Sequence, residues 1–184
     1  MMDTRQNSLL NKNAPAWLSR VQIRVVTEAD LPALEWDGEY SHFRRLYLEV
    51  FRSTQEGKAI MWVAELMEVN IIGQLFVQLT SSRKELANGT SRAYFYGFRV
   101  KPKYQGHGVG TKLLRTAEED LVQRNFRWAT LNVGRDNPGA RRLYERLGYH
   151  IVANEAGRWS YQDQDGNRHE VNEPAWRMEK LLDL

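Results

Sequence analysis

The sequence predicts an α+β domain with a mixed sheet, and two observations support this. Segments with strand character and segments with a helical apolar stripe follow one another in a mixed order, neither strictly alternating nor separated into two blocks. The 184 residues, 42% hydrophobic and 27% charged, are enough for one sizeable core. This composition excludes a wholly disordered or a collagen-like chain.

Residues 1–20 are polar and aperiodic, and we interpret them as a flexible leader to a single domain that spans residues 21–184. Within the domain, alternating or aromatic runs predict strands, and apolar residues three and four positions apart predict helices. Gly38 is expected to split the first helical region in two. The expected elements are a strand at 21–25, two helices within 31–56, strands at 59–66, 71–79 and 93–100, a helix at 109–122, a strand at 128–133, a helix at 137–147, and strands at 149–153 and 176–182.

Composition also narrows the function classes. The absence of cysteine excludes disulfide frameworks, cysteine-based zinc sites and a cysteine nucleophile, and the four histidines show no metal-ligand spacing, so we expect no metal. The net charge of +3 is scattered, which argues against a nucleic-acid partner. The apolar run Ala59–Ala64 is too short to span a membrane, and Met1–Asn13 lacks the apolar centre of a signal peptide. We therefore expect a soluble, cytoplasmic protein without membrane contact.

A glycine-rich loop lies between the strand expected at 93–100 and the helix that follows it. It runs from Gln105 to Thr111 and holds glycine at alternate positions. Backbone N–H groups at a helix N-terminus attract anions, and glycine lets a bulky phosphate reach them. The loop therefore predicts a pyrophosphate cradle on residues 106–111. Thr111 stands where a Rossmann loop needs its third glycine, and the order Gly110-Thr111-Lys112 does not fit a Walker A loop.

Two motifs together resemble the GNAT family of N-acetyltransferases. The first is Val100-x-Pro102-x-x-Gln105-Gly106-x-Gly108-x-Gly110. The second is Leu131-Asn132-Val133, followed by Asn137, Ala140, Leu143-Tyr144-Glu145 and Leu147-Gly148-Tyr149. The resemblance covers roughly Val21 to Leu182. It implies a mostly antiparallel central sheet flanked by helices on both faces, and transfer of an acetyl group from acetyl-CoA to a primary amine by direct attack in a ternary complex.

The resemblance also implies a set of acetyl-CoA contacts on the glycine loop and beside it. A backbone N–H at Phe98 or Val100 would stabilise the oxyanion. Asn137 would contact the cofactor arm, and because Pro138 follows it, it is also expected to cap a helix. The implied contacts are Phe98, Val100, Gln105, Gly106, His107, Gly108, Val109, Gly110, Thr111 and Asn137.

Tyr144 is the predicted general acid. A phenol with an ordinary pKa near ~10 is protonated at pH 7 and can protonate a leaving thiolate. The alternative is a core aromatic residue on the helical stripe that also holds Leu143 and Leu147. The resemblance implies a base that removes the proton of the attacking amine, often a glutamate on the strand expected at 93–100. The segment from Arg92 to Pro102 contains no acid, so it offers no such base. A water relay is preferred, and the candidate side chains are Glu39, Asp37, Glu65 and His42.

The acceptor stays open between a small-molecule amine and a peptide amine. Five acids between Glu28 and Glu39 predict either an acidic lip that favours a cationic amine or a solvated helix face. The sequence leaves three roles open for the aromatic residues Trp159, Tyr161 and Trp176: they line the acceptor pocket, pack under a loop or form the face of a homodimer. The alternative function is a non-catalytic acyl-CoA-binding or regulatory module on the same fold.

Overall fold

The structure, a computed structural model, describes residues 14–183. Within them, seven strands form one sheet in the order β1-β2-β3-β4-β5-β9-β6, and β7 and β8 form a separate hairpin. The strands are β1 (Gln22–Val25), β2 (Ala59–Leu66), β3 (Asn70–Gln78), β4 (Arg92–Val100), β5 (Trp128–Gly134), β6 (His150–Glu155), β7 (Arg158–Gln162), β8 (Arg168–Asn172) and β9 (Ala175–Leu181). The α-helices are α1 (Arg44–Gln55), α2 (Val109–Gln123) and α3 (Pro138–Arg146). Short 3-10 helices are η1 (Ala16–Arg20), η2 (Glu28–Glu35), η3 (Ser41–Phe43) and η4 (Pro102–Tyr104).

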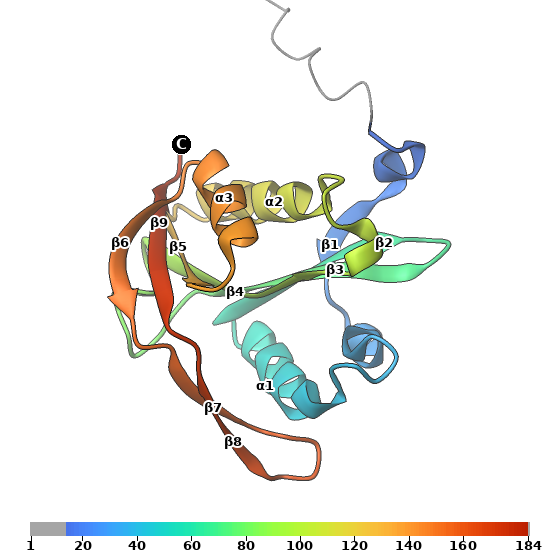
Figure 1. Ribbon diagram of the computed structural model, residues 1–184, viewed down its shortest axis with the longest axis horizontal. Coiled ribbons are helices and arrows are strands. Elements are labelled where there is room, and N and C mark those ends of the chain that lie inside the picture. The colour runs from blue at the N-terminus through green and yellow to red at the C-terminus, as the bar shows by residue number, and fades with distance from the viewer. Residues whose placement is uncertain (1–13, 184) are drawn as a thin grey trace, which may run out of the picture.

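The sheet is mixed and mostly antiparallel. Among the strand pairs of the described residues, β4 and β5 are parallel and the others are antiparallel. Helix α1 covers one face of the sheet, and α2 and α3 lie on the opposite side (Figure 1). The predicted α+β class, with helices on both faces, is confirmed.

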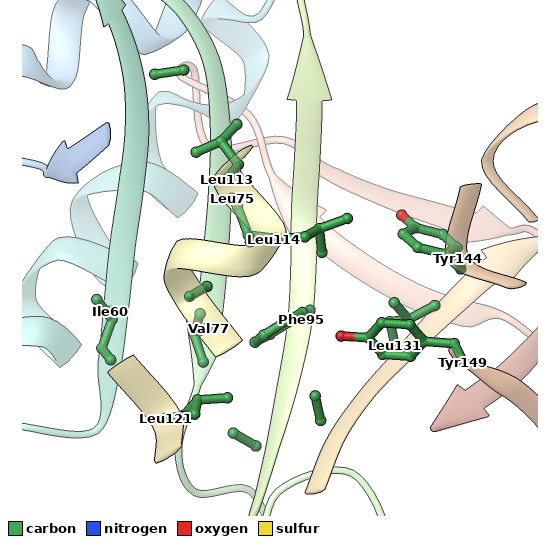
Figure 2. Packing of buried hydrophobic residues seen from close by; sticks show 14 of the residues in the cluster. Ile60, Leu75, Val77, Phe95, Leu113, Leu114, Leu121, Leu131, Tyr144 and Tyr149 are labelled. Carbon is green, nitrogen blue, oxygen red and sulfur yellow. The ribbon is translucent and has the colours of Figure 1, made fainter. Parts of the chain in front are cut away.

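Two hydrophobic clusters fill the space between the sheet and its helices. On the α2 side, Leu113, Leu114 and Leu121 are fully buried and pack against strand residues such as Leu75 and Phe95 (Figure 2). On the α1 side, the cluster of buried residues is Val26, Leu34, Tyr47, Val50, Ala59, Met61, Val63, Ile71 and Phe76. The apolar stripes of α1 and α2 therefore face the sheet.

The N-terminal segment differs from the expectation of a loose leader where the structure describes it. Ala16–Arg20 forms η1, and Trp17 and Leu18 pack against the α2-side cluster. The ammonium of Lys112 on α2 donates hydrogen bonds to the carbonyls of Leu18 at 3.3 Å and Val21 at 3.0 Å. Residues 1–13 of the predicted leader lie outside the described residues.

Two further elements differ from the sequence prediction. The first helical segment is the 3-10 helix η2, which contains Pro32, a residue that has no N–H to donate within a helix. The hairpin β7–β8 lies between the strands expected at 149–153 and 176–182, where no strand is expected from the sequence, and its turn contains Asp165 and Gly166. Most side chains of both strands are exposed, so the hairpin has no buried face to produce an alternating apolar pattern.

Candidate active site

A cleft of about 700 Å³ opens beside the C-terminal end of β4. This volume is within the range of small-molecule and cofactor sites. The glycine loop with the first turn of α2, the end of β4, helix α3 and the segment after η2 all contribute to its wall. The lining residues are Trp36, Tyr40, Phe98, Arg99, Val100, Pro102, Gln105, Gly106, His107, Gly108, Gly110, Thr111, Asn137, Gly139, Ala140, Leu143, Tyr144 and Arg146.

The parting of β4 and β5 creates room for this cleft. The two strands pair only from Arg92 with Trp128 to Phe95 with Leu131. Beyond that point β4 continues to Val100 beside β3, with a bulge in the register of the β3–β4 pair. Beyond Phe95, the backbone N–H and C=O groups of β4 on the β5 side therefore form no hydrogen bonds with β5.

Gly97 lies at the bulge and requires the absence of a side chain. Its φ of 59° is left-handed, and a Cβ there would lie 2.6 Å from Cδ2 of Phe76. The side-chain amide of Gln74, which is fully buried, donates a hydrogen bond to the Gly97 carbonyl at 3.1 Å. These contacts hold the bend that directs Phe98 and Arg99 into the wall of the cleft.

The glycine loop ends at an uncapped helix N-terminus. Gly108 is the N-cap of α2, has a φ of 99°, and accepts a hydrogen bond from the Lys112 amide at 3.0 Å. The amides of Val109, Gly110 and Thr111 have no partner within the helix, and no other described residue accepts a hydrogen bond from them. These free donors and the helix dipole favour an anion. The phosphate cradle at this position stays a prediction.

The predicted cofactor contacts gather in one place, with one exception. Val109 is fully buried in the α2-side cluster, so only its backbone is available to a ligand. Gln105 lines the cleft but also donates a hydrogen bond to the Val100 carbonyl at 2.8 Å, which ties the loop to β4. Asn137 lines the cleft as well, and its Oδ1 caps α3 by accepting a hydrogen bond from the Ala140 amide at 3.0 Å.

Tyr144 on α3 lines the cleft and is also part of the buried cluster. Its position is compatible with a role as general acid and with a role as a core aromatic residue. Tyr144 is 7% exposed, and its ring lies 6.2 Å from that of Phe98 and 5.9 Å from that of Tyr149. Figure 2 shows Tyr144 beside Tyr149. No described residue is hydrogen-bonded to its hydroxyl group. Burial raises the pKa of the Tyr144 phenol well above its ordinary value, which keeps the hydroxyl protonated at neutral pH.

None of the four candidate bases lines the cleft. Glu39 and Asp37 are exposed, and neither lines it. The Glu65 carboxylate on β2 accepts a hydrogen bond from Nε of Arg24 at 2.7 Å. The His42 ring packs 4.2 Å from the ring of Phe43. Among residues 14–183, no aspartate or glutamate lines the cleft.

Two of the five acids before α1 are held in ion pairs. Asp30 accepts two hydrogen bonds from the Arg24 guanidinium, at 2.7 and 2.9 Å. Glu35 pairs in the same forked way with Arg44, at 2.6 and 2.8 Å. Arg24 is shared between Asp30 and Glu65, whereas Asp37 and Glu39 are exposed and form no ion pair with a described residue.

Sequence reasoning missed several residues of the cleft wall, notably Trp36, Tyr40, Arg99 and Arg146. Trp36 and Tyr40 come from the segment after η2, and no motif marked them. Arg99 follows the aromatic run of β4. The one sequence signal that could have marked it is a charged residue within a strand. These residues meet only through tertiary contacts, which a single sequence does not reveal.

Two features are absent from the described part of the chain. Within residues 14–183, no group of three or more histidine, aspartate and glutamate side chains is placed to hold a metal ion. Across the same residues, no helix has both the length and the apolar character needed to cross a bilayer.

Comparisons with known proteins agree with this architecture. A model of the acetyltransferase (GNAT) family matches residues 26–149. N-alpha-acetyltransferase 40 of Saccharomyces cerevisiae is 42% identical over 64 residues, which are 31% of this chain and only 22% of that protein. The alignment therefore leaves most of the yeast protein without a counterpart.

Solved structures share the fold at low sequence identity. Ard1 from Thermoplasma volcanium superposes with a TM-score of 0.69 at 19% identity, covering 90% of this chain and 99% of that chain. The spermidine/spermine N-acetyltransferase SpeG from Vibrio cholerae superposes with a TM-score of 0.67 at 20% identity, covering 91% and 95%. At these identities the likeness concerns the fold alone.

Proposed function

The chain belongs to the acetyltransferase (GNAT) family, and from this we propose that it transfers an acetyl group from acetyl-CoA to a primary amine in a ternary complex. One observation carries the proposal: an uncapped helix N-terminus and a buried tyrosine line the same cleft. The first offers anion-binding amides, and the second offers a proton, as acetyl transfer from a thioester requires.

The glycine loop is proposed to bind the pyrophosphate of acetyl-CoA. The free amides of Val109, Gly110 and Thr111 are the donors, and the dipole of α2 adds to their attraction for phosphate. A Cβ at Gly110 would lie 2.9 Å from Cζ of Phe98, so glycine keeps the loop close to β4. His107 and Arg146 line the same cleft and supply side-chain N–H donors.

The amine is proposed to attack the thioester carbonyl directly, so that a C–N bond forms and the C–S bond breaks. The thiolate that leaves takes the hydroxyl proton of Tyr144, which burial keeps protonated. A backbone amide of β4 at Phe98 or Val100 would donate to the oxyanion, near the point where β5 diverges.

Water is proposed to accept the proton that the attacking amine must lose. The cleft wall of the described residues offers no carboxylate for this purpose, and Glu39 and Asp37 face solvent. A relay through ordered water needs no single positioned base. The proposal thus gives Tyr144 a specific role as the acid. It gives Glu39 no necessary role as a base.

The test is acetyl-CoA-dependent release of thiol in the presence of a panel of primary amines, with mass spectrometry of the acceptor. We expect thiol release that depends on an amine, together with a product heavier by one acetyl group. A protein that binds acetyl-CoA but acetylates no amine would instead be the non-catalytic module. A protein that does not bind acetyl-CoA would contradict the proposal altogether.

A further inference from the structure

Arg99 is a cation at the cleft whose surroundings supply no anion. Its side chain lies between three aromatic rings, with Cζ 3.8 Å from the ring centroid of Tyr40, 5.3 Å from that of Phe43 and 5.9 Å from that of Tyr47. Nη2 donates a hydrogen bond to the Tyr47 hydroxyl at 2.7 Å. Arg99 forms no ion pair with any residue that the structure describes.

The neighbours of Arg99 fix the group without neutralising it. Burial raises the pKa of the Tyr47 phenol, so this partner stays a neutral hydroxyl. Aromatic faces stabilise a guanidinium through their quadrupoles, but they carry no net charge. A half-buried guanidinium held in one orientation, with donors to spare, is preorganised to bind a planar anion.

The position of Arg99 separates it from the phosphate cradle. Phe98 and Val100, its neighbours on β4, pack against the α2-side cluster. The side chain of Arg99 points to the other face of the sheet, because its contacts are with Tyr40, Phe43 and Tyr47 on the α1 side. The phosphate-binding amides belong to α2, so Arg99 lies on the side of the cleft that the proposed cofactor leaves to the acceptor.

Trp36 helps to position this aromatic group at the cost of an unusual backbone. Its φ of 47° and ψ of 61° are left-handed, which a bulky residue rarely adopts outside functional sites. The indole is 6% exposed, lines the cleft, and meets the ring of Tyr40 edge-on at 5.2 Å. Tyr40 in turn lies under Arg99. The strained residue therefore supports the ring against which the guanidinium rests.

We infer that the acceptor is an amine that also carries a carboxylate, and that Arg99 binds this carboxylate. The inference rests on the proposed function, because it names the acceptor class of the same cleft. The charged side chains of the cleft wall agree with it: Arg99 and Arg146 are cationic, and no described carboxylate lines the wall. A polyamine would meet the cations Arg99 and Arg146 on this wall.

The first test compares matched acceptors. Acetyl-CoA-dependent thiol release is measured with the standard L-amino acids, with the carboxamide of each, and with spermidine as an amine without a carboxylate. For the best amino acid, kcat/KM should exceed that of its carboxamide by about tenfold or more. Equal values for acid and amide, or a preference for spermidine, would overturn the inference while leaving amine acetylation intact.

The second test changes Arg99. In Arg99→Met the value of kcat/KM for the amino acid should fall roughly a hundredfold, with little change for the carboxamide, while Arg99→Lys should keep part of the preference. Arg52→Met is the matched control, since Arg52 is exposed in the last turn of α1. Persistence of the preference in Arg99→Met would remove Arg99 from acceptor binding.

A third measurement does not depend on turnover. Calorimetry with CoA present should show N-acetyl-L-amino acids binding to the parent and to Arg52→Met, and binding at least tenfold more weakly to Arg99→Met. Absence of binding to the parent would contradict the inference. If neither acetyl-CoA binding nor thiol release occurs with any amine, the proposed function itself fails, and carboxylate binding at Arg99 is judged separately by calorimetry with the same compounds.

Discussion

The ring of Phe98 lies 6.2 Å from the ring of Tyr144, with an angle of 45° between the two planes. This contact joins the C-terminal part of β4 to α3 at the place where β4 and β5 have parted. It also places the side chain of Phe98, from the part of β4 that does not pair with β5, beside the Tyr144 phenol that is proposed as the acid. The shape of the cleft therefore depends on the packing between these two elements.

Tyr144→Phe should reduce turnover roughly a hundredfold to ten-thousandfold while leaving acetyl-CoA affinity nearly unchanged. The change removes the proton donor and keeps the ring that packs against Phe98 and Tyr149. Steady-state kinetics at a saturating acceptor and calorimetry with acetyl-CoA measure the two effects separately.

Tyr149→Phe is the matched control for that variant. The Tyr149 hydroxyl donates a hydrogen bond to Oε1 of Glu118 at 2.8 Å and does not line the cleft. Its loss should lower the free energy of unfolding by about 1 kcal/mol and leave turnover close to that of the parent. Equal turnover of Tyr144→Phe and the parent would return Tyr144 to a purely structural role.

No single replacement among Glu39, Asp37, Glu65 and His42 should abolish activity. The four side chains lie outside the cleft wall, so water remains to accept the proton. In the parent and all four variants, kcat/KM should rise with pH toward the pKa of the acceptor amine, because only the neutral amine attacks. A loss of about a hundredfold in one folded variant, with its acidic limb displaced, would identify a positioned base.

Gly97→Ala should destabilise the protein by about 2–4 kcal/mol, because the new Cβ meets the Phe76 ring and the backbone is left-handed. Gly38→Ala is the control: Gly38 has a φ of 96°, and its Cβ would meet nothing within 4 Å. That variant should lose only about 1 kcal/mol. Urea unfolding measures both. Equal losses would show that the bulge does not depend on the close approach of Phe76.

Asp30→Asn should lower the free energy of unfolding at pH 7 by about 1 kcal/mol, because Asp30 completes the capping box with Thr27 and pairs with Arg24. The Arg24 guanidinium holds the pKa of the Asp30 carboxyl well below its ordinary value. For a lowered pKa, the carboxylate stabilises the fold fully above the ordinary value near ~4 and loses this effect as the pH falls.

The stability of the parent should therefore decline on acidification below pH ~4, and Asp30→Asn should show a smaller decline. Glu49→Gln provides the control, since Glu49 is exposed on α1 and forms no ion pair with a described residue. Denaturant unfolding at several pH values measures the three proteins. Identical acid dependence in the parent and in Asp30→Asn would show that this ion pair contributes nothing.

Local patterns were enough to predict most of the sheet and the glycine loop that precedes α2. The order of elements, the glycine at the N-cap of α2 and the cap at Asn137 follow from side-chain periodicity and helix-end chemistry, which act within a few residues. The 3-10 character of η2 did not follow. Propensity alone also does not predict the left-handed Trp36 that ends this helix.

The acceptor side of the cleft could not be predicted for a related reason. Arg99 meets Tyr40 and Tyr47 across 59 and 52 positions of the chain, and no short motif encodes such a contact. The bulge at Gly97 is likewise a matter of register between β3 and β4. Counting charges suggested an acidic lip, but a count does not reveal that Asp30 and Glu35 form ion pairs with Arg24 and Arg44.

The central claim is that the amides at the start of α2 bind the phosphates of acetyl-CoA, and calorimetry on two glycine variants tests it most directly. Gly108→Asp adds a side chain and a negative charge at the N-cap of α2, whereas Gly57→Asp adds the same group at an exposed glycine that is also left-handed. Acetyl-CoA should bind Gly108→Asp at least about tenfold more weakly than the parent, and Gly57→Asp with parental affinity. Parental affinity in a folded Gly108→Asp protein would contradict the account.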